Sequence, residues 1–170
     1  LILSDKNLSS ERLPMPMLLC VGAINTFLIQ KKLRGYVSIN VQSGEALDTH
    51  SFATLIGVGA TTVNPYLAFD SLYQRFEKKL FGQYSFDECV NRYIKSVNAG
   101  LLKIMSKMGI SVLSSYRGGC NFETVGLSRT VVDDYFPGVT SKISGIGLVG
   151  IEKKIREIHK EAFESTETIL

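Results

Sequence analysis

The chain has 170 residues, 45% of them hydrophobic and 21% charged, which suits one domain with a buried core and excludes a disordered chain. The net charge of +3 comes from scattered lysines and arginines, so we expect no nucleic-acid partner. No apolar run approaches the roughly 20 residues that cross a membrane, and we expect no membrane partner. Cys20, Cys89 and Cys120 include no CxxC-type pair, which argues against a disulfide framework, a zinc site or a cluster motif.

The first half of the chain alternates between strand and helix patterns. Apolar residues alternating with small polar ones predict strands, and apolar residues at four-residue spacing predict helices. The predicted elements are a strand at 1–4, a helix at 17–33, a strand at 36–41, a helix between 45 and 56, and a strand at 62–63. Each strand is followed by a helix, which is typical of a parallel sheet.

The second half begins with two helices and then becomes less regular. Ser85 followed by Glu88 forms a capping-box signature at the start of a long helix. The predicted elements are a helix at 67–80, a helix at 86–107, a fourth strand at 110–113, helical turns at 122–127 and 129–136, a glycine-rich loop at 138–150, and a helix at 148–163.

Strands separated by helices of ten or more residues imply right-handed crossovers. The sequence therefore predicts an α/β fold of parallel βα units. Four strands are too few for a closed eight-stranded barrel, so we expect a partial, TIM-barrel-like domain. The ends, which open and close without a start or stop signal, favour a single domain fragment, residues 1–170, of a longer polypeptide.

In α/β folds, functional groups gather where strands end and helices begin. The residues at these positions are Asp5, Glu45, Asn64, Tyr116 and Arg117, with Ser43, Gly44 and His50 nearby. Each also has a structural explanation, such as a cap, a first-turn acid or a turn before proline. Arg117 is followed by two glycines and offers a forked donor for phosphate or carboxylate, but a turn or an interdomain salt bridge is the favoured interpretation.

No complete catalytic set is evident among the remaining motifs. The stretch 144–150 contains GxG but follows no strong strand, so it is a weak dinucleotide signature. There is no nucleophile elbow and no HExxH zinc motif. We interpret His50 as a residue on a helix face and His159 as a surface residue of a charged helix.

Several segments, in order along nearly the whole chain, resemble the large subunit of the glutamate synthase family. They include residues 1–5, Ser43-Gly-Glu-Ala, Val63-Asn-Pro-Tyr-Leu-Ala, 103–111 and Ser115-Tyr-Arg-Gly. The resemblance departs at Asn25-Thr-Phe, Gln42 and Ser51, where the family commonly has histidines, a glutamate and a second histidine. These departures argue against a family role for histidines on that face and leave the backbone pattern unchanged.

The resemblance implies an α/β central domain between a glutaminase domain and an FMN-binding domain. The family is an oxidoreductase acting on CH-NH2 donors, which makes L-glutamate from L-glutamine and 2-oxoglutarate. Ammonia passes between its two sites through an internal tunnel. The resemblance implies no catalytic residue or cofactor in this segment, whereas FMN and an iron–sulfur cluster are implied for the full enzyme. It leaves open a small reductase subunit or ferredoxin as electron-transfer partner.

We expect the five strand-end residues to make interdomain or tunnel contacts. We expect the protein to lie in the cytoplasm, or in a plastid if it comes from an alga or plant. A second hypothesis is a stand-alone phosphate- or flavin-binding domain that uses loop 116–119. A third is a protein-interaction module without turnover.

Overall fold

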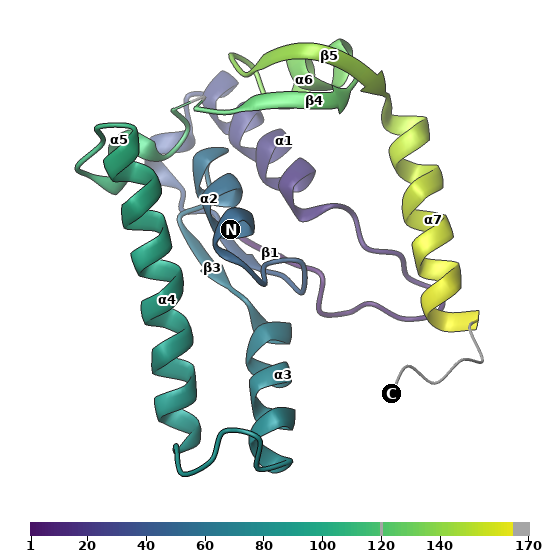
Figure 1. Ribbon diagram of the computed structural model, residues 1–170. Helices are drawn as coiled ribbons and strands as arrows, with labels where there is room; N and C mark the ends of the chain where they lie inside the picture. The colour runs from purple at the N-terminus through teal and green to yellow at the C-terminus, as the bar shows by residue number, and fades with distance from the viewer. Residues whose placement is uncertain (120, 165–170) are drawn as a thin grey trace.

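The computed structural model describes residues 1–119 and 121–164. A three-stranded sheet lies at the centre, and helices α1 and α2 lie close beside it (Figure 1). Helices α3 and α4 extend from it as an antiparallel pair. A second sheet of two strands lies near one end of α1, and α7 runs down the side opposite α4 (Figure 1).

The central sheet is parallel, as predicted, and its strand order is β1-β2-β3. Its strands are β1 (Ile2–Ser4), β2 (Asn40–Gln42) and β3 (Thr62–Asn64), and Val41 pairs with Leu3 on one side and Val63 on the other. β2 begins four residues later than predicted. The predicted first residue, Tyr36, belongs to a 3-10 helix, η1 (Arg34–Tyr36), and not to the strand.

Helices α1 (Met17–Gln30) and α2 (Thr49–Gly57) form the main core with the sheet. Asp48 caps α2 by accepting a hydrogen bond from the Ser51 backbone at 2.8 Å. The core side chains are buried and almost all apolar, which gives the domain its main driving force for folding. They include Val21, Leu28, Ile39, Val41, Phe52, Leu55 and Val97.

Helices α3 (Tyr66–Glu77) and α4 (Phe86–Lys107) confirm the prediction of two consecutive helices. The capping box at α4 is formed as expected: Ser85 and Glu88 each accept a backbone hydrogen bond from the other. Phe86 packs edge-to-face on Tyr73 at 5.5 Å, which joins the free ends of the two helices.

The chain after α4 differs from the predictions. Residues 110–112 form no strand, and α5 (Leu113–Tyr116) is a single helical turn. Residues predicted to be helical turns form strand β4 (Glu123–Leu127), and the predicted glycine-rich loop contains strand β5 (Thr140–Ile146). Helix α6 (Arg129–Tyr135) and helix α7 (Leu148–Glu164) lie where helices were expected.

Strands β4 and β5 are parallel, with two register shifts, and α6 connects them. Gly145 lies directly against the backbone carbonyl of Gly126, so a side chain there would prevent the pairing. Val125 and Ile143 are 67% and 61% exposed, so these strands lack the buried alternation by which a strand is recognised. The glycines and the exposed apolar residues together explain the wrong prediction.

The two sheets share no strand, and the described residues form no barrel. The fold is thus α/β with short parallel strands in open sheets. Within the part of the chain that the structure describes, no helix has both the length and the apolar character to cross a bilayer.

Gly57, at the end of α2, provides a test of the packing between α2 and the chain after α5. A Cβ at this position would overlap the Phe122 ring. We expect Gly57→Ala to lower the free energy of unfolding by about 1–3 kcal/mol, measured by denaturant titration. Gly35→Ala is the control, since a Cβ there meets no described atom within 4 Å. Equal effects of the two substitutions would contradict this packing.

Candidate functional site

Three of the five predicted residues gather at one edge of the central sheet. Asp5 follows β1, Glu45 lies shortly after β2, and Asn64 ends β3. The Asn64 carbonyl accepts a hydrogen bond from the Ser43 backbone at 3.0 Å. Since the strands are parallel, this is their carboxyl edge, where the βα connections were expected to place polar groups.

Asp5 is the centre of this edge. Its carboxylate accepts hydrogen bonds from the Ser43 hydroxyl at 2.6 Å and from the Gly44 backbone at 3.1 Å. Burial, the nearby Asp5 carboxylate and the negative charge of Asp70 raise the pKa of Tyr66 to about 12. Tyr66 is therefore a hydrogen-bond donor at neutral pH and cannot act as a base.

Glu45 connects this edge to the first helix. Its carboxylate accepts a hydrogen bond at 3.0 Å from the Met17 backbone, at the start of α1. The residue as a whole is exposed, but its carboxylate lies against protein. Burial raises the pKa of Glu45, the Met17 hydrogen bond opposes this effect, and the Asp5 charge adds to it.

Cys20 lies half-buried beside the two acids. Burial, followed by the charges of Glu45 and Asp5, raises the pKa of its thiol. Its neighbours therefore keep the sulfur protonated and a poor nucleophile. A cavity of about 380 Å³ opens here, between Cys20, Asp5 and the loop that carries Arg12.

Tyr116 and Arg117 are not part of this edge, because the strand expected before them is absent. Tyr116 is 1% exposed, and its hydroxyl donates to the Ala53 carbonyl of α2 at 3.1 Å. Its ring packs edge-to-face on Phe122. Arg117 follows at the end of α5, and the Gly118 backbone donates to the Gly57 carbonyl at 2.8 Å. Both residues therefore lie at the C-terminal end of α2.

Arg34 is a structural residue that the sequence analysis did not single out. Its guanidinium donates to the Asn25 side chain at 2.6 Å, to the Val37 carbonyl at 2.5 Å and to the Gly59 carbonyl at 2.8 Å. These bonds tie α1, the chain that leads into β2 and the turn before β3 together. The Gly after Arg34 marks a break in the helix, but no local pattern indicates the distant Gly59.

The histidines have different surroundings. His50 is exposed on α2, as predicted. His159 was assigned to the surface, but it is half-buried, and its Nε2 atom lies 2.8 Å from the Ser9 carbonyl. This contact joins α7 to the loop between β1 and α1.

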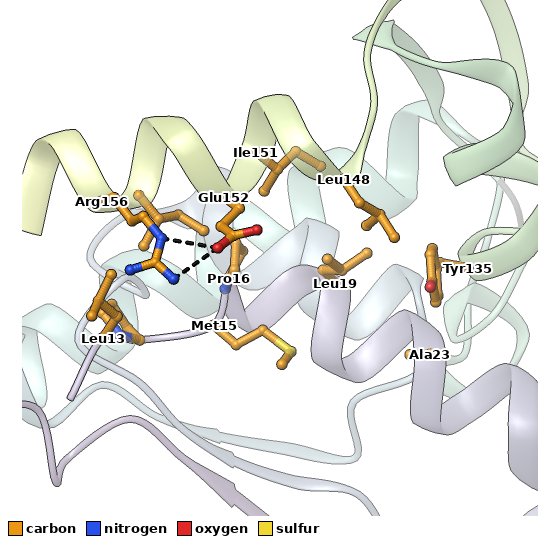
Figure 2. A pocket seen from close by; sticks show the side chains of 12 residues that line it. Leu13, Met15, Pro16, Leu19, Ala23, Tyr135, Leu148, Ile151, Glu152 and Arg156 are labelled. Atoms are coloured by element: carbon orange, nitrogen blue, oxygen red, sulfur yellow. Dashed lines mark hydrogen bonds and ion pairs between the residues drawn. The ribbon is translucent and has the colours of Figure 1, made fainter.

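A second hollow, of about 430 Å³, lies between that loop, α1 and α7. Figure 2 shows Leu19, Leu148 and Ile151 along it, with an ion pair between Glu152 and Arg156 at 2.8 Å. Both charged side chains are largely exposed, so the pair adds little stability. Apart from this ion pair and Tyr135, the side chains that line the hollow are apolar.

The described residues do not fit an iron–sulfur cluster. Cys20 and Cys89 lie on separate helices, and residues 1–119 and 121–164 contain no group of three potential metal ligands among His, Cys, Asp and Glu. Cluster ligation by protein requires several cysteines close together. The described part of the chain therefore supplies no chemical step that passes through such a group.

The fold and its polar edge define the class: an α/β domain whose strand ends carry acids in structural hydrogen bonds. Residues 1–128 match the model of the glutamate synthase central domain, and the chain belongs to that family. It is 52% identical over 162 residues to the glutamate synthase [NADPH] large chain of Azospirillum brasilense, covering 95% of this chain and 11% of the relative.

Other glutamate synthases are also similar to nearly the whole of this chain. The glutamate synthase [NADPH] large chain of Bacillus subtilis is 47% identical over 96% of this chain and 11% of its own. The ferredoxin-dependent glutamate synthase of Pyropia yezoensis is 43% identical over 99% of this chain and 12% of its own. The chain thus spans about a tenth of the length of the curated relatives it matches.

Glu45 provides a pH test of this edge. Its folded-state pKa is raised, so its ionisation destabilises the fold, and this loss of stability develops as the pH rises from the ordinary pKa of 4.5 through the folded-state pKa. We expect Glu45→Gln, which keeps an oxygen acceptor for Met17, to remove this loss. The measurement is the free energy of unfolding at several pH values for both proteins. A difference between them that does not change with pH would contradict the assignment.

Proposed function

We propose that this chain is part of a glutamate synthase, an oxidoreductase that makes L-glutamate from L-glutamine and 2-oxoglutarate with reducing equivalents. The observation that carries the proposal is membership of the central-domain family over residues 1–128. The acids of the carboxyl edge engage in structural hydrogen bonds and the nearby thiol has a raised pKa. The segment alone is therefore proposed to be inactive.

Within the enzyme, the segment is proposed to link and space the glutaminase and FMN-binding domains and to help enclose the ammonia tunnel. Ammonia must be shielded from bulk water between the two sites. Asp5, Glu45, Asn64, Tyr116 and Arg117 are the proposed interdomain or tunnel contacts. The hydrogen bonds of Asp5 and Glu45 support this role because they hold three chain segments in fixed positions. We also propose that strands from outside residues 1–170 complete a barrel-like sheet with those of this segment.

FMN, the iron–sulfur cluster and the electron donor are proposed to bind outside this segment. The relatives name different donors, NADPH in Azospirillum brasilense and ferredoxin in Pyropia yezoensis, although both align with nearly all of this chain. The proposed electron-transfer partner of the whole protein is therefore either a small reductase subunit or ferredoxin. The proposed location is the cytoplasm, or a plastid in an alga or plant.

Titration of the chain with FMN separates this proposal from a stand-alone flavin-binding domain. We expect no quenching of flavin fluorescence at concentrations on the order of tens of micromolar. The buried, hydrogen-bonded Tyr116 leaves loop 116–119 without a stacking surface for the flavin. Saturable binding would show that the segment has a cofactor site of its own, and the linking role would be abandoned.

Asp5→Asn in the full-length enzyme tests the tunnel role. An amide in place of the carboxylate loses the charge-assisted bonds to Ser43 and Gly44, so the carboxyl edge loosens. We expect the ratio of glutamine consumed to 2-oxoglutarate consumed to rise as ammonia escapes. Asp133→Asn, at an exposed acid on α6, is the matched control. An unchanged ratio in a folded Asp5→Asn enzyme would remove this edge from the tunnel.

A further inference from the structure

Two arginines meet at the C-terminal end of α2. Arg34 donates to the Gly59 carbonyl, and the residue after Arg117 donates to the Gly57 carbonyl. The two guanidinium groups are close enough for one charge to affect the other: burial, and then the charge of Arg117, lower the pKa of Arg34. This site lies away from the acids of the carboxyl edge.

The two arginines differ in how their donors are used. Arg34 has three acceptors, Asn25, Val37 and Gly59. The Nε atom of Arg117 is buried and has no hydrogen-bond partner within residues 1–119 and 121–164. None of the ion pairs between described residues includes either arginine. Arg117 therefore has an unused forked donor beside a second positive charge.

The helix end itself does not compensate Arg117. Carbonyls at a helix C-terminus carry partial negative charge and attract cations. Here the Gly57 and Gly59 carbonyls already accept bonds from the Gly118 backbone and from Arg34. A buried, unpaired Nε–H next to a like charge is costly, and a carboxylate matches the planar fork of the guanidinium.

The neighbouring backbone favours carboxylate over phosphate. Loops that bind phosphate surround it with free backbone N–H groups. In this loop, the Gly118 N–H donates to the Gly57 carbonyl and the Gly119 N–H donates to the Tyr116 carbonyl at 3.1 Å. The guanidinium of Arg117 thus remains as the main donor, which suits a single carboxylate in a bidentate pair.

We infer that Arg117, with Arg34 beside it, is a docking site for the carboxylate of an aspartate or glutamate in the longer polypeptide outside residues 1–170. The curated relatives are about nine times as long as this chain, since it covers 11% of them, which leaves ample chain to supply that residue. The inference rests on the proposed function only in placing the acid on the same large subunit. It specifies the chemistry of one interdomain contact.

Matched charge variants of Arg117 in the full-length protein test this inference. Gln and Glu have nearly the same shape, so Arg117→Gln and Arg117→Glu differ mainly in charge. Arg117→Lys keeps the charge but loses the fork. The measurement is the hydrogen-exchange rate of backbone amides in 53–61 and 113–119, which reports local opening. Arg129→Gln and Arg129→Glu, at an exposed position on α6, form the control pair.

With a carboxylate partner, exchange should become about tenfold faster in Arg117→Gln, faster still in Arg117→Glu, and intermediate in Arg117→Lys. Without a partner, Arg117→Glu would pair with Arg34 and exchange no faster than Arg117→Gln, which would overturn the inference. If Arg117→Glu does not fold, slower or unchanged exchange in Arg117→Gln relative to wild type would also overturn it. The control pair should show no such order.

Added inorganic phosphate distinguishes a free anion from a side chain. If phosphate slows exchange in the wild-type protein but not in Arg117→Gln, the site binds a small oxyanion and the inference is wrong. The order of the hydrogen-exchange rates among the Arg117 variants does not depend on ammonia coupling. The carboxylate inference can therefore fail while the tunnel proposal stands, and it can hold if the tunnel proposal fails.

Discussion

The hydrogen bonds of the Asp5 carboxylate hold the carboxyl edge of the central sheet together. Strands of three residues form few ladder bonds and are marginal without additional contacts. Asp5 binds the chain after β2 through Ser43 and Gly44, and the Ser43 backbone in turn donates to the Asn64 carbonyl at the end of β3. A single side chain from the end of the first strand thus fixes how the next two strands lead into their helices.

Arg34 has the corresponding role at the opposite edge. Its three bonds join the end of α1 to the chain entering β2 and to the turn entering β3. Asp5 therefore stabilises one edge of the sheet and Arg34 the other. This separation puts Arg34 beside Arg117, and it puts Asp5 close enough to Glu45 to raise the cost of ionising that acid. The same arrangement that holds the sheet also creates the unbalanced charges at each edge.

The sequence was informative where local pattern and burial agree. The parallel sheet, the capping box at Ser85 and the positions of Asp5, Glu45 and Asn64 were predictable because apolar periodicity locates the elements and the strand ends follow. Arg34 could not be found, since its acceptors at Val37 and Gly59 come together only in the folded chain. Arg117 was assigned to a strand end because an apolar run at 110–113 resembles a strand, but that run leads into a helical turn instead.

The chain after α5 also folds differently from the part before it. The buried residues of both core clusters all come from the chain up to Tyr116. After Tyr116, the buried apolar residues among those described are Val131, Val132 and Phe136, in and next to α6. These residues lie against α1, where the Thr26 hydroxyl donates to the Tyr135 carbonyl at 3.3 Å. No residue of α7 is buried, and Val149 is 81% exposed. Hydrophobic burial provides most of the driving force for folding, so β4 and β5 depend on the packing of α6 against α1. Helix α7 is held by β5 and by the contact of His159 with Ser9. The exposed apolar side chains of these elements are the part of the domain most dependent on neighbouring structure.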